Sequence, residues 1–252
     1  TFQMTDRFNA KLLHLLLACV MVVGLQACSH LPSKPVATNA SSTTSAVWQP
    51  EDQMAWERVR IPGKVATQYS VVKVSNRSTL KATAQSSASM LRKDLRIEPT
   101  QLGQLGFSWQ VQSLIETADM ALRDQDDSPV RLVLAFDGDR NRFSAKNAML
   151  SELSHAVTGQ PMPYATLMYV WCNKRPVGSV IENPRTDRIR KMVIESGESR
   201  LGQWLSYERN IRADFEKAFG EPPGALIGIG LMTDSDNTRS HAQAWYGAIQ
   251  LK

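Results

Sequence analysis

Apolar and polar residues alternate strictly through much of the chain. Between residues 105 and 111 the odd positions hold Leu105, Phe107, Trp109 and Val111, and the even positions hold glycine or polar residues. Because successive side chains of a strand point to opposite faces, this period of two predicts a strand with one buried face. Residues 130–137 repeat the pattern. Further strands are predicted over residues 165–173, 188–196, 226–233 and 242–251, with weaker ones over residues 56–61, 69–75 and 80–87.

Two segments replace the alternation by the spacing of a helix. In the first, Ser144 is the predicted N-cap, and Gly159 followed by Pro161 ends the helix. The second helix begins near Ile211 and ends at Gly220. A third segment, residues 114–122, shows a weaker helical pattern. The apolar residues of the first helix fall along one stripe: Met149, Leu150, Leu153, Ala156 and Val157.

The predicted elements favour one fold class. Strands are many and helices few, strands and helices do not alternate, and no glycine-rich phosphate loop is present. This combination predicts a mainly β fold, an antiparallel β-sandwich that is jelly-roll-like, with two or three short helices. Residues 48–252 are long enough to form it as a single domain.

The N-terminal region has the layout of an export signal. Arg7 and Lys11 precede an apolar run over residues 12–23, which is shorter than the roughly 20 residues that a membrane-spanning helix needs. The tetrapeptide Leu25-Gln26-Ala27-Cys28 follows and resembles the lipobox of bacterial lipoproteins. An ordinary secretory signal with an incidental cysteine is the alternative.

The lipobox resemblance implies a lipid-anchored protein. Residues 1–27 would be removed as the signal peptide, and Cys28 would carry the lipid that holds the protein to the membrane. Residue Ser29 points, by resemblance to sorting signals, to the outer membrane, with the protein facing the periplasm. Residues 28–47 are rich in Ser, Thr, Ala and Pro and predict a flexible linker.

Charge and cysteine content limit the partners. The net charge of +5 includes Asp6, Arg7 and Lys11 of the signal, which leaves +4 on the mature chain. This mild excess without a run of Lys or Arg, together with export, argues against nucleic acid and is compatible with acidic glycans or lipid headgroups. Once Cys19 is removed and Cys28 acylated, Cys172 has no disulfide partner. Its apolar strand predicts a buried core residue, with a reactive thiol as the alternative.

Several motifs in order carry a resemblance to a known family. They are Tyr-Ala-Thr-Leu-Met-Tyr-Val-Trp-Cys-Asn at residues 164–173, Asn-Pro-Arg-Thr-Asp-Arg-Ile-Arg at 183–190, Gly-Leu-Met-Thr-Asp-Ser-Asp-Asn-Thr at 230–238 and Ala-Trp-Tyr-Gly at 244–247. This arrangement resembles the bacterial envelope family catalogued as domain of unknown function 3047. The resemblance covers most of the mature domain but implies no activity.

A looser resemblance concerns the fold. The chain is similar to the C-terminal half of jelly-roll, galactose-binding-like carbohydrate-binding modules in the order of its motifs, which are Trp204, Arg209-Asn210, Asp214, Phe219-Gly220, a strand, Asp234-x-Asp236 and a final aromatic strand. The similarity implies a fold and a possible carbohydrate ligand, and it identifies no site residue.

Two acidic turns are candidate calcium or hydroxyl-binding loops. Asp137 and Asp139 occupy alternate positions that could converge on a hard cation, and Asp234, Asp236 and Asn237 form a similar loop. The first is not an EF-hand, because its sixth position is an arginine and its twelfth an alanine. Since Asp and Asn are also common turn formers, ordinary strand-end turns are the alternative.

The strand over residues 165–173 holds the candidate aromatic binding residues. Tyr169 and Trp171 could stack on the apolar face of a sugar, while Arg185, Asp187 and Arg188 bind its hydroxyl groups. The alternative is that both rings fill the core and that the charges form surface pairs. Because the acidic turns and these charges all lie at strand ends, they are expected to gather at one end of the sandwich.

No recognisable catalytic motif is present. His155 and His241 have no partner at a defined spacing, and the sequence lacks H-E-x-x-H, G-x-S-x-G, C-x-x-C and Walker motifs. No catalytic residue is therefore assigned. The sequence favours a non-enzymatic envelope lipoprotein that binds a ligand, most plausibly a glycan. A hydrolase that uses the Asp pairs, or a structural lipoprotein that contacts other proteins, is the alternative.

Overall fold

The structure, a computed structural model, describes residues 45–252. They belong to one unit that extends over Ser41–Lys252. The predicted signal peptide, the acylated Cys28 and most of the predicted linker lie outside the described residues. Within the described part, no helix has the length and apolar character needed to cross a membrane.

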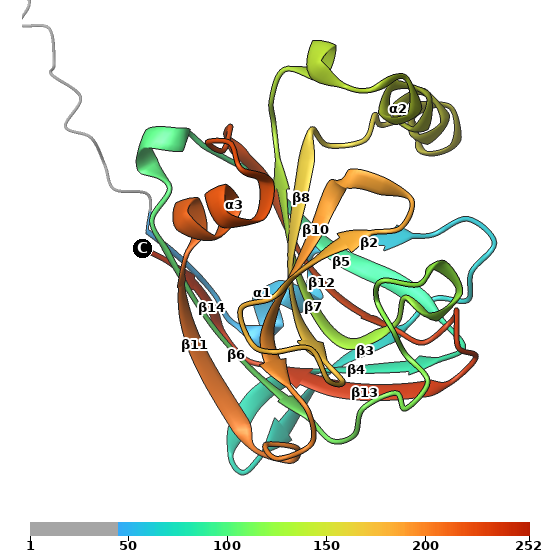
Figure 1. Ribbon diagram of the computed structural model, residues 1–252. Coiled ribbons are helices and arrows are strands. Elements are labelled where there is room, and N and C mark those ends of the chain that lie inside the picture. The colour runs from blue at the N-terminus through green and yellow to red at the C-terminus, as the bar shows by residue number, and fades with distance from the viewer. Residues whose placement is uncertain (1–44) are drawn as a thin grey trace, which may run out of the picture. The chain divides into compact units, whose positions relative to one another are not determined.

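Fourteen strands form two seven-stranded sheets that face each other (Figure 1). Sheet A contains β1 (Ala46–Trp48), β3 (Gln68–Val74), β4 (Arg77–Gln85), β6 (Gln104–Val111), β11 (Trp204–Asn210), β13 (His241–Tyr246) and β14 (Ile249–Leu251). Sheet B contains β2 (Glu57–Arg60), β5 (Ala88–Ile97), β7 (Ser128–Phe136), β8 (Ala165–Cys172), β9 (Val180–Asn183), β10 (Thr186–Ser196) and β12 (Leu226–Asp234). The helices are α1 (Pro50–Met54), α2 (Ala145–Thr158) and α3 (Ile211–Phe219), with 3-10 turns η1 (Pro99–Gln101), η2 (Arg123–Gln125) and η3 (Arg140–Arg142).

The inward faces of the two sheets share one hydrophobic core. In β6, Leu105, Phe107, Trp109 and Val111 are all buried, as their alternation predicts. Phe107 of sheet A stacks on Tyr169 of sheet B with ring centroids 5.6 Å apart, so the sheets are in direct contact. All strand pairs are antiparallel except β8 with β10. The prediction of a mainly β, antiparallel sandwich with two or three short helices is confirmed.

Each strand predicted from alternation is present, with small differences in length. The segment predicted as one strand over residues 242–251 is two strands, β13 and β14, separated at Gly247. Residues 114–122, which show a weak helical pattern, form turns instead of a helix. That segment covers the outer face of sheet B, where Met120 packs beside Cys172 and Val193. Cys172 is buried, as predicted.

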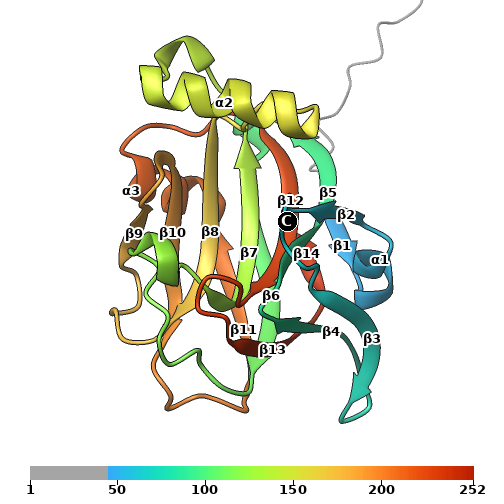
Figure 2. The ribbon, with the colours of Figure 1, turned by 90° about the vertical axis from the view of Figure 1, so that its right-hand side faces the viewer.

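Strand directions define two ends of sheet B. In the antiparallel pair β7 and β12, Phe136 lies opposite Leu226, and Ser128 lies opposite Asp234. The end of β7 therefore lies beside the start of β12. Figure 2 shows α2 lying across the end of the sheet at which β7 finishes. We call this the α2 end, and we call the opposite end, where β12 finishes, the Asp234 end.

Helix α2 has the predicted caps but an unexpected orientation. Ser144 accepts a hydrogen bond from the backbone of Asn147, and Gly159 adopts the left-handed conformation at φ 76°. The side chains that α2 buries are polar, Asn147 and Ser151. Its apolar stripe faces solvent, with Met149 65%, Leu153 59% and Val157 55% exposed.

Candidate functional site

The residues proposed from sequence do not gather into one site. Asp137 follows the last residue of β7, whereas Asp234 lies opposite the first residue of β7. A strand rises about 3.3 Å per residue, so the two acidic turns are separated by roughly 30 Å. The expectation of a single cluster is wrong, because β7 and β12 run in opposite directions and both finish with an acidic turn.

The aromatic pair of β8 lies in the core. Tyr169 and Trp171 are 0% and 1% exposed, so neither ring can stack on a ligand. The Tyr169 hydroxyl donates to Asp214 Oδ2 at 2.8 Å, and Trp171 Nε1 donates to the carbonyl of Gly197 at 3.0 Å. The alternative assignment of these rings to the core is therefore the one that the structure supports.

Buried charges form a network at the Asp234 end. Arg131 donates to both carboxylate oxygens of Asp234, at 2.8 and 2.9 Å, and to Asp126 at 3.1 Å. Lys191, fully buried, lies 2.6 Å from the other oxygen of Asp126. Burial raises the pKa of Asp234 to about 6 although Arg131 opposes the shift, and burial lowers the pKa of Lys191 to about 8. These hydrogen bonds and ion pairs connect the loop before β7, which contains Asp126, to strands β10 and β12.

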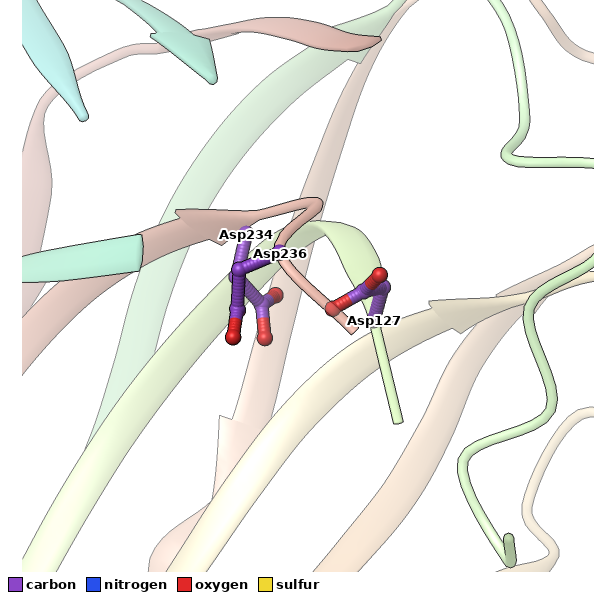
Figure 3. Close-up of side chains that lie close together, drawn as sticks. All are labelled: Asp127, Asp234 and Asp236. Atoms are coloured by element: carbon purple, nitrogen blue, oxygen red, sulfur yellow. The ribbon is translucent and has the colours of Figure 1, made fainter. Parts of the chain in front are cut away.

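One group of three carboxylates in the described part of the chain has the geometry of a potential metal site. It joins Asp127 to Asp234 and Asp236 (Figure 3). Each carboxylate already has donors: Asp127 accepts four hydrogen bonds from Asn237 and Thr238, and Asp236 lies 2.5 Å from Lys64 Nζ. Since Arg131 also holds Asp234, every carboxylate of the cluster already has a partner within the chain, which fits a structural junction.

A second charged group lies at the α2 end. Glu221 accepts from Arg188 at 2.9 Å and from the Tyr164 hydroxyl at 3.0 Å, and its other oxygen lies 2.9 Å from Arg142. Partial burial opposes ionisation, but the bonds from Arg188 and Tyr164 hold the pKa of Glu221 below its usual range. This group joins η3 and β10 to the segment that follows α3.

The remaining predicted residues at this end are held by local contacts. Asp137 lies 3.3 Å from Arg96, and Asp139 caps η3 by accepting from the backbone of Asn141 at 3.0 Å. Arg185 is exposed in the turn between β9 and β10. The predicted strand-end turns are therefore present, and each carboxylate has a structural partner.

A polar cleft of about 670 Å³ lies between α2 and the edge of sheet B. Asp187 is on its wall and accepts from Asn147 Nδ2 at 2.6 Å, while Thr186 donates to the amide oxygen of Asn147 at 2.7 Å. Lys146 and Glu182 also line it, and its lining contains no aromatic side chain. The cleft offers hydrogen bonds, but no ring on which a sugar could stack.

A second cleft, of about 510 Å³, lies beside β1 and β2. Trp48 and Trp56 line it and meet edge to face at 5.8 Å. Its charged groups are engaged with one another, because Arg92 lies 2.7 Å from Glu57 and 3.1 Å from Asp94. Trp56 is only 6% exposed, so the aromatic surface that faces the cleft comes from Trp48, which is partly exposed.

The outer face of sheet A carries a row of partly exposed side chains. Gln110 of β6 lies opposite Trp204 of β11 on one side and Trp245 of β13 on the other, and Trp245 lies opposite Lys81 of β4. All four side chains are partly exposed, whereas the residues next to them along each strand that point inward are buried in the core. Neighbouring strands are about 4.8 Å apart, so the Cα atoms of the two tryptophans, which lie two strands apart, are separated by about 10 Å.

The two indole rings are held in defined positions. A Cβ added to Gly247 would fall 2.9 Å from Trp204 Cζ2 and in collision with Ser108 Oγ, so the Trp204 ring lies against the backbone of Gly247. The Arg77 guanidinium lies 5.0 Å above the Trp204 ring, and Lys81 Nζ lies 5.8 Å above the Trp245 ring. The aromatic row, defined as Trp204, Gln110, Trp245, Lys81 and Arg77, is therefore a preformed surface with rings and hydrogen-bond donors.

Sequence reasoning did not identify the aromatic row as a site, although both tryptophans belong to the motifs quoted above. A signal was available in β13, where Trp245 falls between Ala244 and Tyr246, two inward-facing residues. Strand β11 was not predicted, so the direction of Trp204 could not be assigned.

Comparisons with solved structures give distant likenesses to β-sandwich proteins. The glycoside hydrolase domain of Endo-D from Streptococcus pneumoniae R6 matches with 9% identity over 78% of this chain and a TM-score of 0.32, and the match spans only 21% of that chain. The xylan-binding module CBM86 from Roseburia intestinalis matches with 10% identity over 82% of this chain and 94% of that one, at a TM-score of 0.30. A variant of the Cel12A cellulase of Rhodothermus marinus matches with 9% identity over 83% and 97%, at a TM-score of 0.36. At such TM-scores these likenesses carry no argument about function.

The family comparison is more direct. No curated protein matches the chain in sequence. A family model matches residues 54–250, which is nearly all of the described sandwich and includes each of the motifs that suggested the resemblance. The chain therefore belongs to the DUF3047 family of proteins of unknown function.

Proposed function

We propose that this protein is a lipid-anchored protein of the bacterial envelope that binds a glycan, without hydrolysing it, on the outer face of sheet A. The observation that carries the glycan proposal is the aromatic row. Two partly exposed tryptophans lie on the two strands that flank β6, with Gln110 of β6 between them, and a cation lies over each ring.

The chemistry of the row matches that of a sugar. The apolar face of a sugar ring packs on an indole, and its hydroxyl groups need hydrogen-bond partners at the ring edge. Arg77 and Lys81 supply donors over the two rings, and a carboxylate-bearing sugar would also neutralise these two cations. Gln110 adds an amide group between the rings, although its nitrogen also donates to the carbonyl of Gly202. Because the row lies on an open sheet face, it suits a stretch of chain in which two sugar units contact the two rings.

The placement of the carboxylates favours binding over hydrolysis. Glycoside hydrolysis uses two carboxyl groups about 5 to 9.5 Å apart. Of the two Asp pairs that the sequence offered for this role, Asp234 and Asp236 have carboxylate oxygens within 4.8 Å of each other, but Asp236 is already paired with Lys64. Asp234 is also held by two bonds from Arg131 in the interior. These observations support a binding role.

The anchor in this proposal rests on the sequence. Cys28 in Leu25-Gln26-Ala27-Cys28 would carry the lipid, and Ser29 favours the outer membrane. A lipid-held protein with a glycan-binding face would connect the membrane to an envelope polysaccharide.

Affinity electrophoresis through gels that contain neutral or acidic polysaccharides tests the glycan proposal. We expect retardation of the wild-type protein, and loss of at least about tenfold in affinity in Trp204→Ala and in Trp245→Ala, since buried aromatic anchors dominate such interfaces. Trp48→Ala is the matched control, because Trp48 is also partly exposed but lies outside the row. Equal retardation of all four proteins, or loss of binding in Trp48→Ala alone, would contradict the proposal.

A further inference from the structure

Helix α2 has its polar side toward the protein and its apolar side toward solvent. The side chains that it buries are Asn147 and Ser151, four residues apart and thus on one face. On the other face Met149, Leu153 and Val157, again at four-residue intervals, are each more than half exposed. An amphipathic surface helix normally buries its apolar stripe against the protein. Here the apolar stripe is exposed to solvent, as on a surface that contacts another molecule or a membrane.

Polar contacts fix this orientation. The amide of Asn147 donates to Asp187 at 2.6 Å and accepts from Thr186 at 2.7 Å, and both partners belong to the start of β10. Turning the apolar stripe inward would remove Asn147 from these bonds and leave buried polar groups without partners. The outward position of the stripe is therefore a property of the folded domain.

We infer that the apolar stripe of α2, defined as Met149, Leu153 and Val157, rests on the surface of the lipid bilayer. This inference depends on the proposed anchor. Sixteen residues lie between Cys28 and Ser45, the first described residue, and a fully extended chain of that length spans at most about 60 Å. The lipid would thus keep the domain permanently close to one large apolar phase, at a high effective concentration.

The charge at the start of the helix also suits a lipid surface. Lys146 lies seven residues before Leu153, in line with the stripe, and is exposed. Arg142, in the turn before the helix, is 62% exposed on its side chain although it also contacts Glu221. Long basic side chains can reach anionic phosphate groups while a neighbouring apolar stripe lies between the headgroups.

Site-specific fluorescence tests the inference in the full acylated protein. Cys172 is buried and Cys28 carries the lipid, so a cysteine introduced at Leu153→Cys is the intended site for an NBD label. The matched control is Val65→Cys, which is 68% exposed and lies at the Asp234 end, where it pairs with the residue before β5. Both labelled proteins are reconstituted into vesicles of anionic and zwitterionic phospholipid, with and without nitroxide-labelled lipid.

We expect the emission from position 153 to shift to shorter wavelength and to be quenched by the nitroxide lipid, and the emission from position 65 to do neither. Flotation of the vesicles measures anchoring separately. If the protein floats but position 153 is not quenched, the inference is wrong while the anchor stands. If the protein does not float, the anchor proposal fails and the inference fails with it.

Two other results would show that something other than the bilayer contacts the apolar stripe. A blue shift at position 153 that appears without vesicles and increases with protein concentration would show a second copy of the chain on the stripe. A concentration-independent shift without vesicles would show a segment of the same chain there. Either result overturns the inference.

Discussion

Arg131 is the residue on which the buried charges at the Asp234 end depend. It is 3% exposed and donates to both Asp234 and Asp126, so it compensates two carboxylates in the interior. Removing one partner of a buried ion pair leaves an uncompensated charge, which costs about 3–5 kcal/mol. We therefore expect Arg131→Met to lower the free energy of unfolding by that amount, measured by urea denaturation.

The matched control for Arg131 is Arg96→Met. Arg96 also contacts two carboxylates, those of Glu98 and Asp137, but its side chain is 57% exposed. Because ion pairs exposed to water contribute little, this change should alter the free energy of unfolding far less than Arg131→Met does. If both variants lost the same free energy of unfolding, the buried ion pairs of Arg131 would stabilise the protein no more than the exposed pairs of Arg96.

Gly247 is required by a close approach rather than by its backbone angles. A Cβ at this position would collide with Ser108 Oγ and lie 2.9 Å from the Trp204 ring, so Gly247→Ala must displace the ring. Overpacking of this kind costs about 1–3 kcal/mol. We expect Gly247→Ala to lower stability by that amount and to weaken glycan binding.

Gly228→Ala, in β12, provides the comparison for Gly247. The nearest atoms to a Cβ there are 3.6 and 3.7 Å away, which is ordinary contact. Thermal unfolding and polysaccharide binding of this variant should both resemble those of the wild type. A Gly247→Ala protein that behaved in the same way would show that the Trp204 ring is free to move.

At the scale of elements, Glu221 connects three segments at the α2 end. Its folded pKa is lowered, so its ionised form stabilises the folded state above the unfolded value of about 4.5, and this contribution is lost as the pH falls through the folded pKa. The free energy of unfolding of Glu221→Gln should therefore lie below that of the wild type at pH 7, and the difference should shrink at pH 3.

Urea denaturation at the two pH values measures this difference. Glu116→Gln, at an exposed position, controls for the loss of one negative charge and should change stability by less than about 0.5 kcal/mol at pH 7. A Glu221→Gln deficit that was the same at pH 3 and pH 7 would mean that the carboxylate stabilises the protein through something other than its charge.

The elements differ in how far their sequence predicts them. Strand β6 is predictable because each of its buried apolar residues alternates with a partly exposed glycine or polar residue. Strand β5 is not, because its Arg-Lys-Asp run at residues 92–94 interrupts the apolar pattern on an exposed stretch. The caps of α2 follow from Ser144 and Gly159, but its orientation does not. Asn147 determines that orientation through Thr186 and Asp187, which are 39 and 40 residues away.

At the scale of the whole molecule, strand order decides which residues can form a site. The sequence correctly places Asp137 and Asp234 at the ends of strands, but no local pattern shows that β7 and β12 pair in opposite directions. The aromatic row has the same origin, since Trp204 and Trp245 are brought to either side of Gln110 only by the pairing of β11, β6 and β13. The sequence did not predict which residues lie together, because that depends on which strands pair and in which register.

Anchoring is also a property of the whole molecule. Cys28 is the residue that the lipobox resemblance assigns to the lipid, so Cys28→Ser should abolish incorporation of labelled fatty acid and release the protein from the membrane fraction. Because residue 28 precedes the sandwich, the circular dichroism spectrum should be unchanged. A Cys28→Ser protein that still incorporates fatty acid would refute the lipoprotein assignment.

The central claim is that the outer face of sheet A binds a glycan without cleaving it. A glycan array probed with the wild-type protein and with Trp245→Ala, combined with mass-spectrometric analysis of the bound glycans for cleavage, tests this claim most directly. We expect the wild-type protein to bind a defined set of glycans, Trp245→Ala to lose them, and every glycan to remain intact. Cleaved products, or binding that Trp245→Ala retains in full, would contradict it.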